Sequence, residues 1–516
     1  MISSVLGLKF NPSKCSSLSF VNGKPAKAMM FIDGGQLKCL GTEDKEVYLG
    51  IPIGAKLRFR PTAELLPKLD KLAASLLAPW QKLEVYRSHL IPSLANELAS
   101  GRVEKKVLAT YDTECRKFLG LVAAVPSHAV TEFFYADRSV GGLDTFQLGE
   151  DADIWTLSRA TQLLTSKDAL VRHVARAQLE DTIVRGFRHS LPDPLPLTDF
   201  LSGSTDGGMY RLRYGGSTKT NLWTPARRAA MRLRVRFDFS GESSCRIPAD
   251  EVSALPLKAV RGLRKVVRDR NTKKFLDSKH QGKVATALAL GQKTTDMARL
   301  ISCKTDLRFE YWTYFHRARL DILPLRGYFW YEGLDRSCRK CGKLVEDGFH
   351  VLNSCKSQMV LYTKRHDAIL QQLHQVIARK GYAAKVNRAI AGQRLRPDLE
   401  MIVNGTRVMV YVVVAFDIPE NLAAAFNRKI EKYQSFGKIL PLVVGSLGSW
   451  PSSNNDIMSF LKLDSRIWKT FTRKAKLTAI QHTMGVIRCH IGCRATSTQG
   501  DLNQQTDKED DRSSLS

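Results

Sequence analysis

A pattern of cysteines and a histidine restricts the fold of this chain more than any other feature. Cys338 and Cys341 are separated by two residues, His350 follows after eight more, and Cys355 after a further four. Two thiolates in a tight turn, completed by a nearby histidine and a third cysteine, form the tetrahedral donor set of a structural zinc ion. Such a closed site folds a local module and leaves no open position for catalysis. We therefore predict a zinc knuckle, against the alternative of unrelated thiols beside a chance histidine.

A continuous apolar run at residues 408–416 is the next informative feature. Its β-branched composition predicts a buried strand, and Asp417 follows directly at its end. Upstream, Asp398 ends the tripeptide Arg-Pro-Asp. Hydrolysis of a phosphodiester needs carboxylates that hold Mg²⁺ and a cation that stabilises the charged transition state. Two aspartates and a lysine would meet that need, although a Pro-Asp turn and a strand-end aspartate are each common without catalysis.

The candidate cation lies in the segment after this strand. Apolar residues recur at helical spacing between residues 421 and 433, which predicts a helix. Lys429 and Lys432 would lie about one turn apart on it, with Tyr433 beside them. The pattern does not choose between the two lysines. Glu400 is a further possible metal ligand, although an acid on a strand surface is the simpler interpretation.

Positive charge is spread along the whole chain. Lysine and arginine total 79 against 50 acidic residues, for a formal net charge of +29. A broad positive field suits a phosphate backbone, whose counterions are released on binding, so we expect a nucleic-acid partner. A solvated helix face is the alternative for any single run. The candidate nucleic-acid-binding residues are Arg227, Arg228, Arg232, Arg264, Lys265, Arg268 and Lys82.

The chain of 516 residues is too long for one hydrophobic core, so several domains are expected. No uninterrupted apolar run approaches the length of a membrane span, so we expect an intracellular protein without one. Apolar periodicity, glycine content and charge divide the chain into six parts. These are a strand-rich part at 1–58, a helical part at 59–200, a basic linker region at 201–330, the knuckle at 331–357, a mixed region at 358–495 and a polar tail, expected to be disordered, at 496–516.

The order of these parts resembles the C-terminal portion of polyproteins from site-specific non-LTR retrotransposons, the class inserted in arthropod ribosomal RNA genes (the R-two class). Residues 7–15 and 48–50 resemble the end of its reverse transcriptase palm, and residues 79–83 with 90–92 resemble its thumb. Residues 319–327 loosely resemble its linker motif. The knuckle spacing and the Pro-Asp, Asp and Lys-x-x-Lys-Tyr array resemble its knuckle and restriction-enzyme-like endonuclease.

The resemblance implies a multidomain α+β protein with a β-rich palm remnant, a helical thumb, a helical basic linker, a zinc knuckle and an α/β restriction-endonuclease-like core. Its endonuclease would nick double-stranded target DNA, and the exposed 3′ end would prime reverse transcription of the element's RNA. The residues assigned to that centre are Asp398, Asp417, Lys429, Lys432 and Tyr433, with the two aspartates holding Mg²⁺. The usual restriction-enzyme lysine position, two residues after the second acid, holds Pro419, so the lysine must come from the following helix.

The polymerase part departs from the pattern. Reverse transcriptases hold two metal ions on a tight hairpin with paired aspartates, and no Tyr-x-Asp-Asp or Phe-x-Asp-Asp occurs here. We therefore expect no polymerisation by this chain, and a fragment of a longer polyprotein or a degraded copy. Three classes of function stay open: a Mg²⁺-dependent DNA endonuclease, a nucleic-acid-binding module, and a remnant with no retained activity. The implied location is the nucleus, with the nucleolus where ribosomal RNA genes are the target, and the oligomeric state stays open.

A second cysteine group lies near the end of the chain. Cys489 and His490 are followed by Cys493, with His482 upstream. Metal binding is conceivable, but a pair of buried thiols at a helix end is the favoured interpretation.

Overall fold

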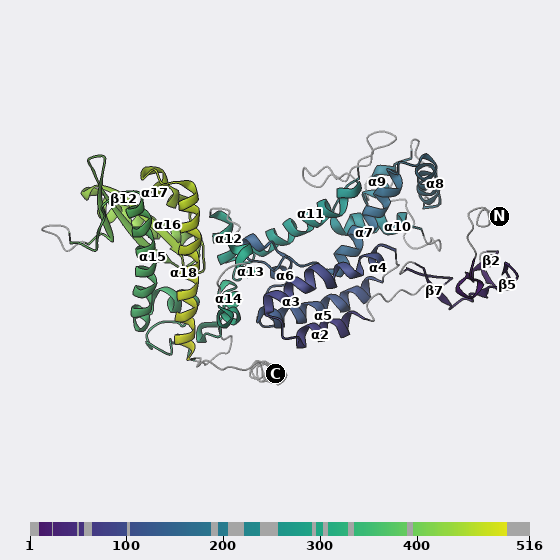
Figure 1. Cartoon of the computed structure of the whole chain (residues 1–516), viewed down its shortest axis with the longest axis horizontal. Coiled ribbons are helices and arrows are strands. Elements are labelled where there is room, and N and C mark those ends of the chain that lie inside the picture. The colour runs from purple at the N-terminus through teal and green to yellow at the C-terminus, as the bar shows by residue number, and fades with distance from the viewer. Residues whose placement is uncertain are drawn as a thin grey trace. The chain divides into compact units, whose positions relative to one another are not determined.

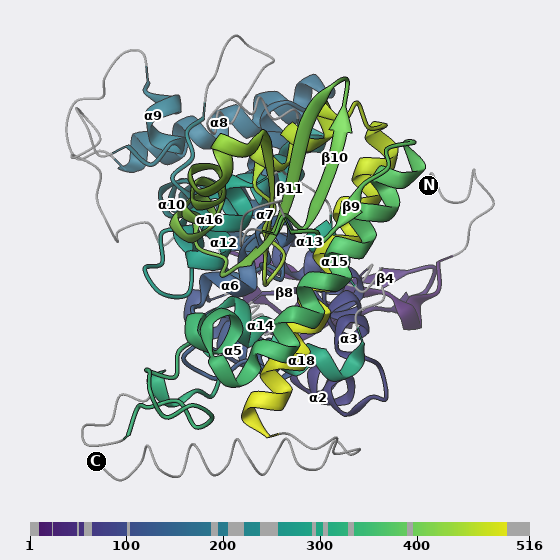
Figure 2. The same cartoon turned by 90° about the vertical axis from the view of Figure 1, so that its left-hand side faces the viewer.

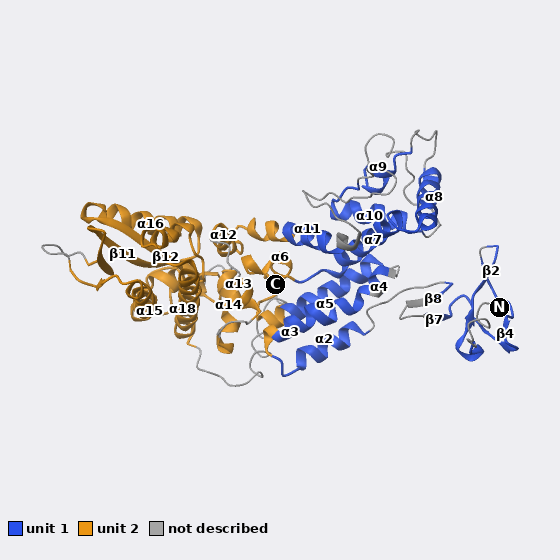
Figure 3. Cartoon of the chain, turned by 45° about the horizontal axis from the view of Figure 1, so that its top comes forward, with its two compact units in different colours: residues 1–77, 81–119, 145–270 blue, residues 78–80, 120–144, 271–516 orange. Residues whose placement is uncertain are grey.

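The computed structural model shows a chain built mainly of helices, with one larger sheet near the C-terminus (Figure 1). It describes residues 10–22, 24–48, 51–55, 64–100, 104–186, 195–204, 221–237, 256–291, 296–302, 308–328, 335–389 and 396–492. The polar tail and Cys493 lie outside the described residues. Unit 1 comprises residues 1–77, 81–119 and 145–270, and unit 2 comprises residues 78–80, 120–144 and 271–516 (Figure 3).

The strand-rich part of unit 1 consists of short two-stranded pieces. Its strands are β1 (Ser16–Ser17), β2 (Ser19–Val21), β3 (Lys24–Ala26), β4 (Phe31–Ile32), β5 (Gly35–Gln36), β6 (Lys38–Cys39), β7 (Lys45–Tyr48) and β8 (Ile51–Gly54). β1 pairs with β6, β2 with β3, β4 with β5, and β7 with β8. The strands expected in this part are therefore present, and its assignment as a palm remnant stays a prediction.

The rest of unit 1 is helical, as the apolar periodicity predicted. The helices that begin within it are α2 (Leu65–Ala74), α4 (Ala95–Ser100), α5 (Lys105–Ala123), α7 (Leu148–Leu164), α8 (Ala169–Gly186), α9 (Leu197–Leu201), α10 (Trp223–Leu233) and α11 (Pro256–Leu276), and α3 (Pro79–Val85) lies mostly within it. One core joins α7, α8, α9, α10 and α11 through buried aliphatic side chains around Trp223. Burial of that apolar surface is the main source of its stability.

Unit 2 begins with short helices and ends in an α/β domain. The short helices are α6 (Glu132–Tyr135), α12 (Lys283–Leu290), α13 (Asp296–Ile301) and α14 (Trp312–Arg319). Arg319, from the predicted linker motif, is buried and donates to the carbonyls of Val140 and Gly141 at 2.9 and 3.1 Å. A guanidinium in this position organises the local backbone, so Arg319 has a structural role.

The α/β domain contains a four-stranded sheet in the order β12-β11-β10-β9. Its elements are α15 (Met359–Arg379), β9 (Lys385–Val386), β10 (Leu399–Val403), β11 (Thr406–Ala415), α16 (Pro419–Tyr433), β12 (Lys438–Gly445), α17 (Asn455–Phe460) and α18 (Ser465–Ile491). β10 and β11 form an antiparallel hairpin, and α16 crosses over to the parallel strand β12. Residues 408–415 of the apolar run lie in the central strand, as predicted, with 408–412 buried, and Phe416 follows the end of the strand.

Helices cover both faces of this sheet. α15, α17 and α18 pack on one face around a core that includes Trp450 and Trp468, and α15 and α18 run side by side (Figure 2). α16 covers the other face, where Leu422 and Tyr433 are buried. The alternation of side chains along β10 places Leu399 and Met401 in the first core, and therefore turns Glu400 toward the α16 side.

None of the helices in the described parts of the chain combines the length and the apolar character needed to cross a bilayer.

Candidate functional site

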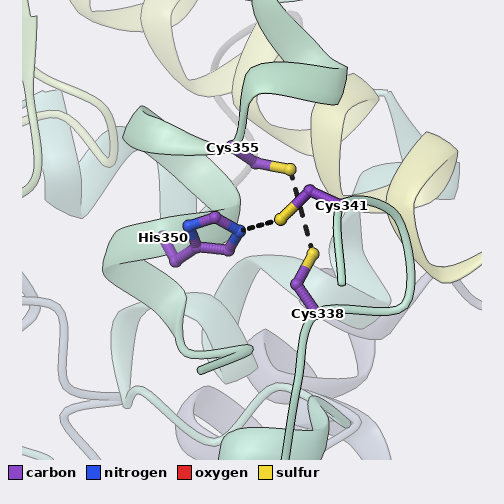
Figure 4. Close-up of side chains that lie close together, drawn as sticks. All are labelled: Cys338, Cys341, His350 and Cys355. Atoms are coloured by element: carbon purple, nitrogen blue, oxygen red, sulfur yellow. Dashed lines mark hydrogen bonds between the residues drawn. The ribbon is translucent and has the colours of Figure 1, made fainter. Parts of the chain in front are cut away.

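The four predicted zinc ligands come together in unit 2 (Figure 4). Cys338 Sγ lies 3.8 Å from Cys355 Sγ, and Cys341 Sγ lies 3.3 Å from His350 Nε2. All four ligand atoms lie within 4.8 Å of one another. A tetrahedral zinc ion with Zn–S bonds of about 2.3 Å places two thiolate sulfurs roughly 3.8 Å apart. The donor set therefore fits a zinc knuckle in both chemistry and spacing.

Local backbone geometry builds the knuckle. The Gly342 N–H donates to the Cys338 carbonyl at 2.7 Å, and the Cys338 N–H donates to the Leu344 carbonyl at 2.8 Å. Gly342 adopts φ +65°, the left-handed conformation that glycine adopts without strain. A backbone hydrogen bond from Lys343 is the main cause that lowers the pKa of the Cys341 thiol, which favours the thiolate that binds metal.

Of the two acids of the predicted nuclease centre, Asp398 is the one that is partly exposed. Its side chain is 16% exposed and precedes β10. Asp398 Oδ2 accepts from the Val412 N–H at 2.7 Å and lies 3.2 Å from His366 Nε2. The other ring nitrogen, His366 Nδ1, lies 2.9 Å from Asp367 Oδ1. Burial alone would lower the pKa of His366, but hydrogen bonds to Asp398 and Asp367 raise it above its ordinary value.

His366 was not found by sequence reasoning. It lies on α15, 32 residues before Asp398, and a single histidine on a helix carries no distinctive pattern. Only the packing of α15 against the sheet brings its ring to the carboxylate.

The lysines of α16 lie over two stacked tyrosines. Tyr411 and Tyr433 have ring centroids 4.2 Å apart. Lys429 Nζ lies 5.0 Å from the Tyr411 ring centroid, and Lys432 Nζ lies 5.2 Å from that of Tyr433. Tyr411 directly precedes Val412, the residue that donates to Asp398, and burial raises the pKa of its hydroxyl. Lys429 therefore lies over the ring of Tyr411, the residue next to the backbone donor of Asp398.

Asp417 lies in a different hydrogen-bond network. The carboxylate is fully buried, and the turn after β12 donates to both of its oxygens. Oδ2 accepts from Leu447 N–H at 2.7 Å and from the Ser446 hydroxyl at 3.1 Å, and Oδ1 accepts from Ser449 N–H at 2.8 Å. Burial raises the pKa of Asp417, although the hydrogen bonds from Ser449, Leu447 and Ser446 act in the opposite direction.

The two aspartates contact different parts of β11. Asp398 bonds to Val412, whereas Asp417 follows the end of the strand at Ala415. At about 3.3 Å per residue, Val412 and Ala415 are already roughly 10 Å apart. A Cβ atom on Gly445 would collide with Asp417 Oδ1, so the turn closes tightly over this carboxylate. The two predicted Mg²⁺ ligands thus have separate hydrogen-bond partners, and their joint binding of Mg²⁺ stays a prediction.

Several predicted nucleic-acid-binding residues of unit 1 take part in internal contacts. Arg264 forms a bidentate pair with Asp151 at 2.8 and 2.9 Å, and Arg232 forms one with Asp153 at 2.8 and 2.6 Å. Buried Arg227 donates to the carbonyls of Asp199, Phe200 and Ser204, and Lys82 donates to the carbonyl of Ala73. Arg228 and Lys265 remain exposed, and Arg268 is half-buried. The acids of α7 thus neutralise part of the basic residues that were predicted to bind the phosphate backbone of a nucleic acid.

The pair of Arg264 and Asp151 yields a stability prediction. Asp151 is 1% exposed and Arg264 is 26% exposed, so alanine at position 151 leaves a largely buried guanidinium without its acid. We expect Asp151→Ala to lower the free energy of unfolding by about 2–4 kcal/mol. Urea denaturation followed by circular dichroism measures this change, with Asp269→Ala on exposed α11 surface as the matched control. A loss no larger than that of the control would show that the pair contributes nothing.

Comparisons with known proteins agree with the resemblance noted in the sequence. No protein-family model matches the chain. The chain is 25% identical to a retrovirus-related Pol polyprotein over 89% of its own length and 86% of that relative. The relative comes from the type-1 retrotransposable element R2 of Popillia japonica. A Pol polyprotein from the type-2 element R2DM of Drosophila melanogaster is 29% identical over 31% of the chain and 16% of that protein. The resemblance to R2 (R-two class) non-LTR retrotransposon polyproteins is therefore confirmed over most of the chain.

Proposed function

We propose that this chain serves an R2-like retrotransposon as a DNA endonuclease joined to part of a reverse transcriptase. The C-terminal α/β domain would nick double-stranded target DNA in the nucleus, and the new 3′ end would prime copying of the element's RNA. Ribosomal RNA genes, in the nucleolus, are the target class. Support comes from the R2 relatives, from the net charge of +29, and from Lys429 over Tyr411, the neighbour of the residue that donates to Asp398.

The domain assignments belong to the same proposal. We assign residues 1–58 to a palm remnant, 59–200 to a thumb, 201–330 to a basic linker, 331–357 to the knuckle and 358–495 to the endonuclease. The order α15, β9, β10, β11, α16, β12, with the acid at the start of the β10–β11 hairpin, supports the last assignment. We assign no polymerisation to this chain, because its sequence contains no paired aspartates of the Tyr-x-Asp-Asp type.

Asp398 is the residue that carries the endonuclease proposal. Among the hydrogen bonds of the described residues, those of its carboxylate fall on Oδ2, which leaves Oδ1 for a metal ion. A Mg²⁺ ion bound there would act as a Lewis acid on the scissile phosphate. Glu400, two residues farther along the chain, would supply a second carboxylate after releasing Arg407, its ion-pair partner at 2.9 Å. We assign Asp417 a structural role.

Exposed basic residues lie on the chain segments next to Asp398 and suit a phosphate backbone. Arg396, Lys385 and Arg388 are exposed, and Lys385 pairs across the β9–β10 ladder with Glu400. Lys429 is half-buried on α16 and lies over the Tyr411 ring, whereas Lys432 is exposed. We therefore choose Lys429 over Lys432 as the cation that stabilises the charge developing on the phosphate. The aromatic pair beneath it limits the orientations of its side chain.

A nicking assay tests the proposal. Purified full-length chain is incubated with supercoiled plasmid and Mg²⁺, with a parallel reaction in EDTA. We expect open-circular product with Mg²⁺ and at least a hundredfold slower nicking by Asp398→Ala, since the metal loses its best-placed ligand. Asp456→Ala, at an exposed acid of α17, is the matched control. Circular dichroism shows that both variants are folded.

Binding of nucleic acid without cleavage is the second candidate, and the environment of Asp417 favours it. A carboxylate whose oxygens already accept three protein hydrogen bonds is a poor metal ligand. Under this alternative the wild type binds duplex DNA with an affinity that falls steeply with salt, because counterions are released. It then yields no open-circular product with Mg²⁺ or Mn²⁺, and that result would overturn the endonuclease proposal.

A further inference from the structure

Three buried polar side chains lie beside the knuckle, outside its four-ligand set. His490, in the last turn of α18, has its Nε2 atom 4.0 Å from Cys338 Sγ and 3.3 Å from Glu346 Oε2. On the opposite side of the ring, Nδ1 lies 3.4 Å from Gln358 Nε2. The ligand atoms of Cys338, Glu346 and His490 all lie within 4.8 Å of one another. Buried polar groups need hydrogen-bond partners, so these contacts indicate which atom of each group donates and which accepts.

The contacts set the tautomer of His490. The ionised carboxylate of Glu346 can only accept, so the Nε2 atom that faces it carries the ring proton, and Nδ1 is left to accept from the Gln358 amide. The Nε2–H group then faces both the Cys338 sulfur and the Glu346 carboxylate. This is the orientation in which a histidine supports a metal thiolate from outside the ligand set.

Glu346 is held firmly in the position that this arrangement requires. Its Oε2 accepts from the Arg339 N–H at 2.6 Å, and its Oε1 accepts from the Arg326 N–H at 3.1 Å. The guanidinium of Arg339 forms an ion pair with the same carboxylate at 2.6 Å. The side chain of Glu346 is fully buried, so its orientation is fixed by these donors. A fixed carboxylate beside the imidazole in turn restricts rotation of the His490 ring.

We propose that His490 is a positioning residue of the zinc site, which donates from Nε2 to the Cys338 thiolate and ties the knuckle to the end of α18. The inference assumes zinc in the set of Cys338, Cys341, His350 and Cys355, and it does not depend on the nuclease proposal. A donor to a metal-bound thiolate spreads its negative charge and makes the sulfur less available to protons and competing chelators. Partners of this kind typically change metal affinity by about 10–100-fold.

His350, and not His490, remains the fourth ligand. His350 Nε2 lies 3.3 Å from Cys341 Sγ, close to the spacing of two ligands on one zinc ion. His490 Nε2 lies farther from its nearest sulfur, at 4.0 Å, and also contacts Glu346. Cys489, the neighbour of His490, is exposed, so the earlier interpretation of this segment as a pair of buried thiols is wrong for Cys489.

Zinc release from the full-length chain tests the proposal. The chain is mixed with a chromophoric chelator, and the rate of zinc transfer is measured for the wild type and for His490→Ala, His490→Gln and His482→Ala. We expect one zinc per chain in all four and about 10–100-fold faster release from His490→Ala. The glutamine variant retains an N–H donor and should recover most of the difference. His482 lies on the same helix outside the cluster, so His482→Ala should behave as the wild type does.

Cobalt substitution separates positioning from ligation. With Co²⁺ in place of zinc, His490→Ala should keep the strong visible bands of a tetrahedral ion but shift the thiolate-to-metal charge-transfer band. His350→Ala should change the visible bands themselves, because a ligand is lost. Zinc stoichiometry falling to zero in His490→Ala, with cobalt bands altered as in His350→Ala, would make His490 a ligand and overturn the proposal. An unchanged release rate and an unchanged charge-transfer band would overturn it equally.

Discussion

Asp417→Ala is expected to lower the free energy of unfolding of the α/β domain by about 3–5 kcal/mol, and not simply to remove activity. The substitution leaves the N–H groups of Leu447 and Ser449 and the hydroxyl of Ser446 without their acceptor inside the protein. An unsatisfied buried donor costs about 1–3 kcal/mol. Buried Arg365 also loses the attraction of a nearby negative charge. The turn after β12 should therefore open, and the core around Trp450 should loosen.

Urea denaturation followed by tryptophan fluorescence measures this effect, because Trp450 and Trp468 lie in the core beside the affected turn. Asp398→Ala is the matched comparison, since its carboxylate is partly exposed and, among the described residues, accepts one backbone hydrogen bond, from Val412. We expect Asp398→Ala to fold normally and to lose nicking. Should Asp417→Ala instead keep wild-type stability and lose nicking, Asp417 would be a metal ligand, as the sequence pattern suggested.

Cys338→Ser is expected to release one zinc per chain and to destabilise the domain by several kcal/mol. Zinc binding at closed four-ligand sites contributes directly to folding, with apparent values of about 10–16 kcal/mol in isolated zinc-finger peptides. The loss here should be smaller, because the segment after His350 also packs against α18. Buried Cys338 additionally contacts both Cys355 and His490, so its loss disturbs the ligand set and its support together.

Elemental analysis of purified protein measures the zinc content, and urea denaturation with and without EDTA measures its contribution to stability. Cys489→Ser is the matched control, because this thiol is exposed and lies outside the cluster. It should retain zinc and stability. Wild-type protein that contains no zinc would refute the knuckle outright.

Patterns in the sequence predicted the features that depend on residues close to one another along the chain. The knuckle depends on ligands within 18 consecutive residues, so spacing alone indicated that Cys338, Cys341, His350 and Cys355 would meet. The strand at 408–416 follows from a short β-branched apolar run, and the helix that carries Lys429 follows from its periodicity. The broad positive charge indicated a nucleic-acid partner but not which arginines are free to reach one. The likeness to R2 polyproteins was likewise apparent from the order of short motifs.

Contacts between distant segments could not be predicted in this way. Arg264 pairs with an acid 113 residues away, so a basic run that suggested phosphate binding forms part of an internal network. His366 reaches Asp398 only because α15 packs against the sheet. His490 reaches Cys338 across 152 residues because the last turn of α18 ends at the knuckle. No periodicity or spacing encodes such pairs, since they depend on how whole elements pack.

The sequence by itself therefore determined the zinc donor set, the central strand with its acids and the lysine helix, because each depends on neighbours along the chain. Only the tertiary structure decided the environment of each acid. Among the described residues, Asp398 is half-buried and its hydrogen bonds fall on one oxygen, whereas the turn after β12 surrounds Asp417 with donors. The physical reason is that a carboxylate's role depends on which donors and charges surround it, and those groups come from parts of the chain far apart in sequence.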